Sequence, residues 1–172
     1  MKYFAYGSNM SLIRLQQRVP SAQKIDTVSL KNHQLRFNMS GKDGSGKCDS
    51  FYTNNSDDMV VGALFEIDEN EKPILDRAES LGSGYNEKTV SVINEQGKTF
   101  EALIYCAIKI DPSLKPYTWY LNHVIVGAKE TKLSTDYLAI IESVVCIEDP
   151  NKERETKERA MYSSHTIQKD CA

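Results

Sequence analysis

The hydrophobic and polar positions of this chain change their period along the sequence, and these periods predict its secondary structure. The apolar run 3–5 predicts a short buried strand. Leu12, Leu15 and Val19 follow at helical spacing, which predicts a helix that begins near Met10. Similar patterns predict further strands at residues 24–30, 33–39, 59–67, 89–93 and 99–107, and further helices that cover 70–79, begin at 116 and begin near 134.

This order, β-α-β-β-β-α-β-β-α-α, predicts one α+β domain with a mostly antiparallel, barrel-like sheet flanked by helices. We assign residues 1–149 to that domain. Gly62 interrupts an apolar strand, which indicates a bulge or the close approach of another backbone segment. Residues 150–172 begin with a highly charged run and have little to bury, so we expect a loosely attached or disordered tail.

Composition limits the classes of function. The chain has 172 residues, of which 40% are hydrophobic and 26% charged, enough for one well-buried core. A net charge of -3 argues against a general nucleic-acid binder. No stretch approaches the ~20 apolar residues that span a membrane, and no leader pattern precedes the first strand. The four cysteines form no CxxC pair, so we expect reduced thiols and a cytoplasmic protein.

The segment Tyr6, Gly7, Ser8 and Asn9 joins the first strand to the first helix. Glycine allows backbone conformations that other residues resist, and serine and asparagine are favoured helix caps. Backbone N–H groups at such a turn, together with the helix dipole, attract anions. The segment therefore predicts a small pocket for a carboxylate or for the oxygen of a carbonyl under attack, or else an ordinary strand-to-helix connection.

Glu79 ends the predicted helix at 70–79 and precedes a loop with two glycines. A carboxylate at a helix C-terminus meets the negative end of the dipole, which raises its pKa. A raised pKa suits a general base or acid near neutral pH. The residues around Glu79 also allow the simpler interpretation of a solvated surface glutamate.

Two other candidate sites are weaker. Residues 41–47 satisfy the phosphate-loop pattern GxxxxGK, but Cys48 follows in place of Ser or Thr and no helix pattern comes after it, which favours a hairpin loop. His33, His123 and His165 lie on separate elements without metal-ligand spacing, so no metal site is expected.

Taken together, these segments resemble the γ-glutamylcyclotransferase family, part of the AIG2-like superfamily. Phe4–Met10 is similar to its N-terminal signature, and Leu75–Glu79 is similar to its Leu-Asp-x-x-Glu segment. Tyr117–Glu130 is similar to its late helix, in which Tyr120 corresponds to a pocket tyrosine. Where the family usually has glycine after the glutamate, this chain has Ser80, which is strained if that position needs a positive φ.

The resemblance implies the family's fold and cleavage of a γ-glutamyl amide by its own α-amine, which releases 5-oxoproline and an amine or amino acid without a cofactor. It implies that Glu79 is the catalytic base and acid, that the backbone of the Tyr6–Asn9 turn binds substrate, and that Tyr120 and Tyr85 line the pocket. The substrate is then a small molecule. Glutathione, a γ-glutamylamine or a biosynthetic intermediate remain alternatives, as do a non-catalytic binding module and either a monomer or a homodimer.

Overall fold

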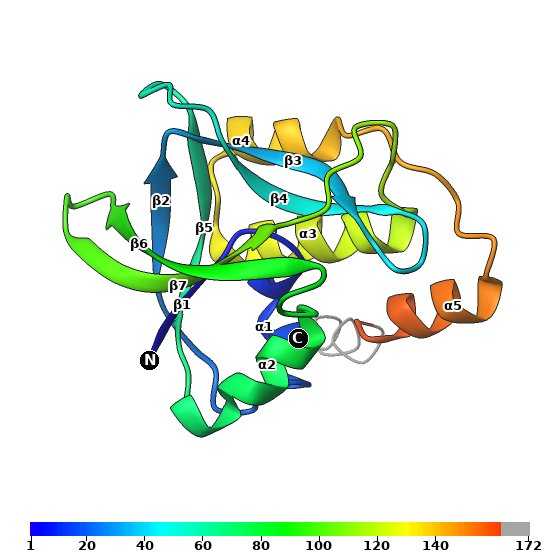
Figure 1. The fold of residues 1–172 in the computed structure, drawn as a ribbon, viewed down its shortest axis with the longest axis horizontal. Coiled ribbons are helices and arrows are strands. Elements are labelled where there is room, and N and C mark those ends of the chain that lie inside the picture. Colours follow the sequence, from blue (N-terminus) through cyan, green and yellow to red (C-terminus); the bar gives the residue numbers. More distant parts are fainter. Residues whose placement is uncertain (163–172) are drawn as a thin grey trace, which may run out of the picture.

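A five-stranded barrel forms the centre of the molecule, a computed structural model that describes residues 1–162 (Figure 1). The strands close in the order β1-β5-β2-β6-β7. β1 pairs in parallel with β7 at Tyr3 and Leu103, and the other pairings are antiparallel. The α+β class and the barrel are confirmed, with a mixed sheet. The strands are β1 (Lys2–Ala5), β2 (Gln23–Lys31), β5 (Met59–Glu66), β6 (Tyr85–Asn94) and β7 (Thr99–Ala107).

A separate hairpin lies across the barrel, formed by β3 (His33–Ser40) and β4 (Gly46–Tyr52). The glycine-rich loop joins these two strands, so the hairpin-loop interpretation is confirmed. The sequence patterns above do not predict β4, because its inward face carries polar residues. Among these, Asp49 is buried and accepts a hydrogen bond from the Ala107 N–H at 2.9 Å, which links the hairpin to β7.

The helices pack beside the barrel and differ in detail from the predicted ones. Asp68 caps η2, the 3-10 turn before α2, so this helical segment begins just before the predicted 70, and Ser134 caps α4, which agrees with the predicted start near 134. None of the helices within residues 1–162 is long and apolar enough to cross a membrane. They are η1 (Ser8–Met10), α1 (Leu12–Gln16), η2 (Glu69–Glu71), α2 (Lys72–Ala78), α3 (Thr118–Thr131), α4 (Thr135–Glu142) and α5 (Lys152–Ala160).

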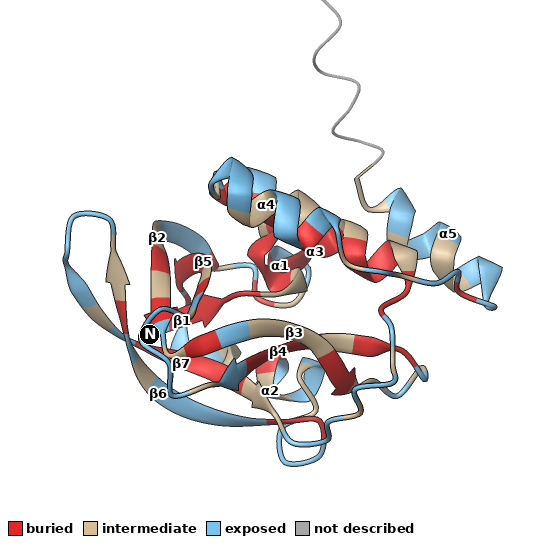
Figure 2. Cartoon of the chain, turned by 90° about the horizontal axis from the view of Figure 1, so that it is seen from above, coloured by how far each residue is buried: buried red, intermediate tan, exposed pale blue. Residues whose placement is uncertain are grey.

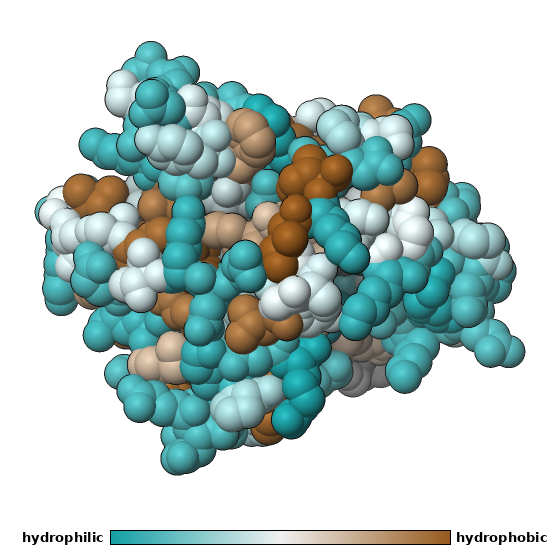
Figure 3. Space-filling model, in the orientation of Figure 1, coloured by the Kyte–Doolittle hydropathy of each residue, from teal (hydrophilic) through white to brown (hydrophobic). Residues whose placement is uncertain are grey.

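Side chains of β1, β5 and α3 supply much of the core, which Figure 2 shows as buried segments at the centre. Gly62 on β5 faces Ala5 on β1 so closely that a Cβ atom would overlap the Ala5 carbonyl oxygen. Close backbone approach, one of its two predicted roles, therefore explains this glycine. In Figure 3 hydrophilic residues cover most of the visible face, with smaller apolar patches between them.

The segment before and within α5 is attached by polar contacts. Arg154 forms an ion pair with the buried Asp149, with an Nε to Oδ2 distance of 2.6 Å. Glu158 forms an ion pair with Arg14 on α1, with an Nη1 to Oε2 distance of 2.9 Å. The predicted loose tail thus contains an attached helix at 152–160, and the rest of that prediction, residues 163–172, lies outside the described residues together with His165.

Candidate active site

The end of α2 fixes the position of Glu79. The N–H of Leu81 donates to the Asp76 carbonyl at 2.9 Å and the N–H of Ser80 donates to the Arg77 carbonyl at 3.1 Å. These two bonds are those of a Schellman motif, which ends a helix with a left-handed residue. Ser80 is that residue, with φ of 52°, so the strain expected from the missing glycine is present. Glu79 is therefore the C-cap residue of α2, directly before the chain reverses.

The turn between β1 and α1 lies opposite Glu79. Gly7 has φ of -118°, so it does not use the left-handed region. Glycine is needed here because there is no room for a side chain. A Cβ atom at position 7 would lie 2.9 Å from Cys48 Cβ and 3.6 Å from the Tyr120 hydroxyl oxygen. The capping roles predicted for Ser8 and Asn9 are wrong, because neither caps a helix with its side chain and Ser11 is the N-cap residue of α1.

Asn9 connects this turn to Glu79 directly. Its amide Nδ2 donates to Glu79 Oε1 at 2.8 Å and lies 3.1 Å from the Tyr3 hydroxyl oxygen. Its Oδ1 accepts from Arg18 Nη1 at 2.9 Å, and the same Nη1 lies 3.7 Å from Glu79 Oε1. The side chain of Asn9 is thus used to hold the carboxylate in place rather than to begin a helix.

Burial controls the acidity of Glu79, whose side chain is 15% exposed. Desolvation raises the pKa of the Glu79 carboxyl above its usual value, while Arg18, the Asn9 amide and Arg14 act in the opposite direction. The raised pKa agrees with the direction expected from the sequence, with burial as the main cause. The carboxyl is neither a solvated surface group nor locked as an anion by a close bidentate ion pair.

A small cavity of about 30 Å³ brings together every residue to which the family resemblance gives a catalytic or substrate-binding role. This inner cavity is deep enough for one small group and lies between the β1–η1 turn and the end of α2. Its walls also include residues that the sequence analysis did not select. The lining residues are Tyr3, Tyr6, Gly7, Ser8, Asn9, Cys48, Glu79, Tyr85, Tyr105 and Tyr120.

The tyrosine hydroxyls of the inner cavity have different partners. Tyr6 donates to the Tyr105 carbonyl at 2.6 Å, and Tyr85 donates to the Cys48 carbonyl at 2.8 Å. The Tyr120 oxygen instead accepts from the Cys48 N–H at 3.0 Å, and the Tyr120 hydroxyl also interacts with the Cys48 side chain. Burial raises the pKa of Tyr85 and of Tyr120 well above the usual phenol value, so both hydroxyls stay neutral.

A larger outer cavity of about 450 Å³ opens beside the inner one. Ser8, Glu79, Tyr85 and Tyr120 line both cavities. Basic side chains predominate in its wall, five against two carboxylates, so its electrostatic potential favours an anion. The five are Arg14, Arg18, Lys42, Lys47 and Lys109, and the two are Asp43 and Glu79.

Lys47 shows what the rejected phosphate-loop lysine does instead. It bonds to Asp43 Oδ2 at 2.7 Å and lies 4.6 Å from the ring centroid of Trp119 and 4.6 Å from that of Tyr120. The loop lysine therefore packs against the aromatic wall of the outer cavity.

The structure also bears on a metal site. Within residues 1–162 no group of histidine, cysteine and acidic side chains has the arrangement of a metal site.

Sequence reasoning missed Arg18, Cys48 and Lys47 as parts of this region. Arg18 lies 3.7 Å from Glu79, a residue 61 positions later in the chain. A single arginine after a short helix gives no sign of such a distant contact, so Arg18 was not selected. Cys48 lies on the unpredicted β4, where its backbone holds two tyrosines. The sequence carries one signal for this region. Arg14 and Arg18 are four positions apart, a spacing that places two side chains on the same face of a helix.

Comparison with known proteins agrees with this geometry. A profile of the AIG2-like family matches residues 59–141. The chain is 30% identical to a human γ-glutamylcyclotransferase over 140 residues, which are 78% of this chain and 73% of that protein. It is 29% identical to a bovine γ-glutamylcyclotransferase over 147 residues, 83% and 77% of the two chains.

A solved structure described as a γ-glutamyl cyclotransferase superposes with a TM-score of 0.82 at 25% identity. The superposition covers 92% of this chain and 98% of that one, so it includes both the barrel and the helices around it. The sequence identity to the human protein and the shared fold lead to one conclusion. This chain belongs to the γ-glutamylcyclotransferase family of enzymes.

Proposed function

We propose that this protein cleaves a γ-glutamyl amide by intramolecular attack of the substrate's α-amine, with Glu79 as general base and then general acid. The observation that carries the proposal is the position of the Glu79 carboxyl. It is largely buried between two adjoining cavities and is hydrogen-bonded to Asn9 of the β1–η1 turn. A buried carboxyl with a raised pKa beside a cavity is typical of a catalytic acid or base.

The first step needs a base because an α-amine is mostly protonated near neutral pH. Glu79 accepts a proton from this amine, and the nitrogen then attacks the γ-carbonyl carbon. Glu79 Oε1 is occupied by Asn9, which fixes the orientation of the carboxylate. Since attack is intramolecular, the main task of the cavity is to hold the glutamyl chain folded, and such positioning contributes several kcal/mol, roughly 7–11 at its limit.

The developing negative charge needs hydrogen-bond donors. Ser8 and Asn9 begin η1, where backbone N–H groups have no acceptor within the helix itself. We assign the backbone of Tyr6, Gly7, Ser8 and Asn9 to the substrate α-carboxylate, to the oxyanion, or to both.

The tyrosines of the inner cavity differ in what they offer the substrate. The hydroxyl of Tyr120, whose oxygen accepts from the Cys48 N–H, is assigned as a side-chain donor to the substrate in place of its contact with the Cys48 side chain. Tyr85 donates to the Cys48 carbonyl, so its oxygen is left as an acceptor, suited to the substrate ammonium group.

The second step returns the proton. As the tetrahedral intermediate collapses, the amide C–N bond breaks and Glu79 gives its proton to the departing nitrogen. A bond from the α-nitrogen to the γ-carbonyl carbon has formed and this nitrogen has lost a second proton to solvent, so the products are 5-oxoproline and a free amine. One carboxyl that serves as base and acid in turn contributes about 10²–10⁴-fold to the rate.

The outer cavity favours a leaving group that is an amino acid or peptide over a simple amine. Arg14, Arg18 and Lys47 have carboxylate partners, whereas no ion pair joins Lys42 or Lys109 to an acid within residues 1–162. Lysines without a carboxylate partner at a cavity rim attract a substrate carboxylate and repel a cationic amine. A γ-glutamyl amino acid carries such a carboxylate next to its scissile bond.

The test is release of 5-oxoproline from a panel of γ-glutamyl compounds: γ-glutamylalanine, γ-glutamylalanine amide, γ-glutamylethylamine and glutathione. We expect release from γ-glutamylalanine to exceed release from the matched amide and amine. Substrate disappearance without 5-oxoproline would indicate hydrolysis instead of cyclisation. Tight binding of the panel with no turnover would favour a binding module.

A further inference from the structure

A chain of polar contacts links the C-terminal helix α5 to α1. Glu158 on α5 bonds to Arg14 Nη1 at 2.9 Å and to His123 Nε2 on α3 at 2.8 Å, in both cases through Oε2. The other ring nitrogen of His123, Nδ1, lies 2.7 Å from the Tyr162 hydroxyl oxygen. His123 is fully buried and Arg14 nearly so, at 8% exposure. Buried charges such as Arg14 need a partner, and Glu158 is the partner that the described residues supply.

The hydrogen-bond directions in this cluster follow from its chemistry. Burial lowers the pKa of His123, so the ring is neutral at neutral pH. A carboxylate only accepts, so Nε2 carries the ring proton and donates to Glu158, while Nδ1 accepts from the Tyr162 hydroxyl. The two hydrogen bonds hold the pKa of Glu158 well down, near 2, so this carboxyl is ionised whenever the enzyme works.

Arg14 also lines the outer cavity with Glu79 and Arg18. Arg14 lies on α1 and Arg18 lies in the turn that follows it, so both guanidinium groups reach the cavity from the α1 segment. In the inner cavity the ionisable groups other than Glu79 are neutral tyrosines and a thiol, since burial raises the pKa of each. They are Tyr3 on β1, Tyr6 after β1, Cys48 on β4, Tyr85 on β6, Tyr105 on β7 and Tyr120 on α3. The wall of the outer cavity adds the ion pair of Lys47 with Asp43, and Lys42 and Lys109.

We propose that Glu158 is a positioning residue for the cyclisation: by binding Arg14, it balances one of the two arginine charges that act on the Glu79 carboxylate. With Arg14 neutralised, the anionic form of Glu79 is favoured by one unbalanced arginine, Arg18, and by the Asn9 amide. If Arg14 were unpaired, two cations would stabilise that anion and make it a weaker base. This inference rests on the proposed role of Glu79, and it gives α5 a part in catalysis at a distance from the reacting atoms.

The test is the pH dependence of kcat/KM for 5-oxoproline release in Glu158→Gln, which removes the charge and keeps the shape. We expect the acid limb of the profile to move to lower pH by on the order of half a unit, the effect of one extra charge across a solvated cavity. The reverse change, Arg14→Gln, should move that limb to higher pH. In Arg14→Gln/Glu158→Gln it should return close to its wild-type position.

Arg159→Gln is the matched control, because Arg159 lies on the same helix but bonds to other residues than Arg14. Its guanidinium donates to Glu155 within α5 and to Thr118 on α3. We expect its acid limb to stay in the wild-type position. An unmoved limb in Glu158→Gln, or shifts of the same sign in Glu158→Gln and Arg14→Gln, would overturn the inference. If Glu158→Gln does not fold, Arg14→Gln and the double variant still decide it. An active Glu79→Gln variant would instead refute the proposed base.

Discussion

Substitution of Gly7 by alanine provides a quantitative test of the site's geometry. The added Cβ would lie 2.9 Å from Cys48 Cβ and 3.2 Å from its Sγ atom. Contacting carbons prefer about 3.5–4.0 Å, so the turn or β4 must move by about 0.6 Å or more. Such overpacking costs about 1–3 kcal/mol of unfolding free energy, which lowers Tm by roughly 2–12 °C in a chain of this size. Misplacement of a catalytic group by about 1 Å costs about 10²-fold, so we expect kcat/KM to fall at least ~10-fold.

The control uses Cys48, the residue against which the new methyl group would press. Cys48→Gly removes the opposing Cβ, so Gly7→Ala/Cys48→Gly should recover much of the activity lost in Gly7→Ala. Gly7→Ala/Cys48→Ala keeps that Cβ and should give little recovery. Tm from calorimetry and 5-oxoproline release are measured for Gly7→Ala and for both double variants. Full activity and an unchanged Tm in Gly7→Ala would refute the argument that this glycine is needed for space.

Three further predictions follow from individual contacts. Ser80→Gly should raise Tm by about 1–4 °C in a thermal melt, because relief of left-handed strain exceeds the added entropy of glycine in the unfolded chain; a lower Tm would contradict this reading of the helix end. Asn9→Ala should lower kcat and move the acid limb to higher pH, because the Asn9 amide lowers the pKa of Glu79; a limb that stays in place would contradict it. The folded-state pKa of Glu158, about 2, lies below its ordinary value, so its stabilisation is full above about pH 4.5 and is lost as pH falls toward 2. Fluorescence of the single tryptophan, Trp119, should report this loss in the wild type and show a smaller change in Glu158→Gln.

The central parts of the candidate site could be predicted because they lie in local motifs. Glu79 ends a helix whose apolar spacing is visible, and the Tyr6–Asn9 segment contains a strand end, a glycine and polar residues in sequence. The reason for Gly7 could not be predicted, since the atoms that would collide with a side chain come from β4. Arg18 was missed for the same reason, because its contact with Glu79 depends on how α1 and α2 pack.

The two elements that the sequence analysis missed are polar ones. β4 buries two adjacent polar residues, Asp49 and Ser50, one on each of its faces, so its hydrophobic pattern is weak and its stability comes from pairing with β3 and from the bond to Ala107. α5 buries none of its residues and is attached through ion pairs such as Arg14–Glu158. Hydrophobic periodicity detects elements that bury apolar faces, and it gives no signal for helices or strands held by charges.

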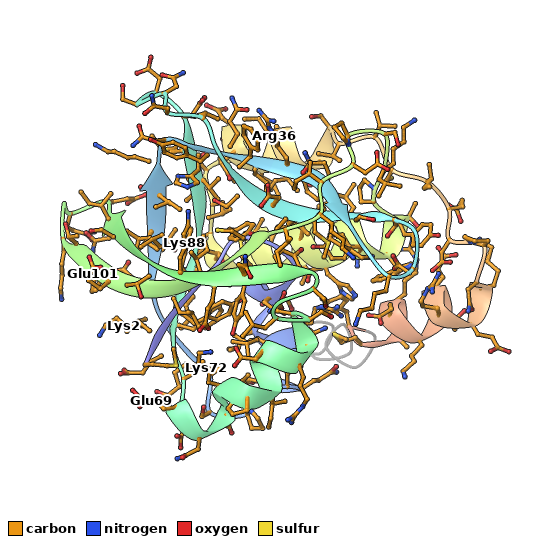
Figure 4. The ribbon with its side chains drawn as sticks, in the orientation of Figure 1. Lys2, Arg36, Glu69, Lys72, Lys88 and Glu101 are labelled. Atoms are coloured by element: carbon orange, nitrogen blue, oxygen red, sulfur yellow. The ribbon has the colours of Figure 1, made fainter. Side chains whose placement is uncertain are left out.

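The most direct measurement of the central claim is 5-oxoproline formation by Glu79→Gln at saturating γ-glutamylalanine, with substrate binding followed by calorimetry. Glu69→Gln is the matched control: Glu69 is an exposed carboxylate at the far end of the same helical segment, beside Lys72, and Figure 4 labels both. The account predicts that Glu79→Gln binds substrate and folds normally while kcat falls at least ~10²-fold, and that Glu69→Gln is unchanged. Near-normal 5-oxoproline formation by Glu79→Gln would contradict it.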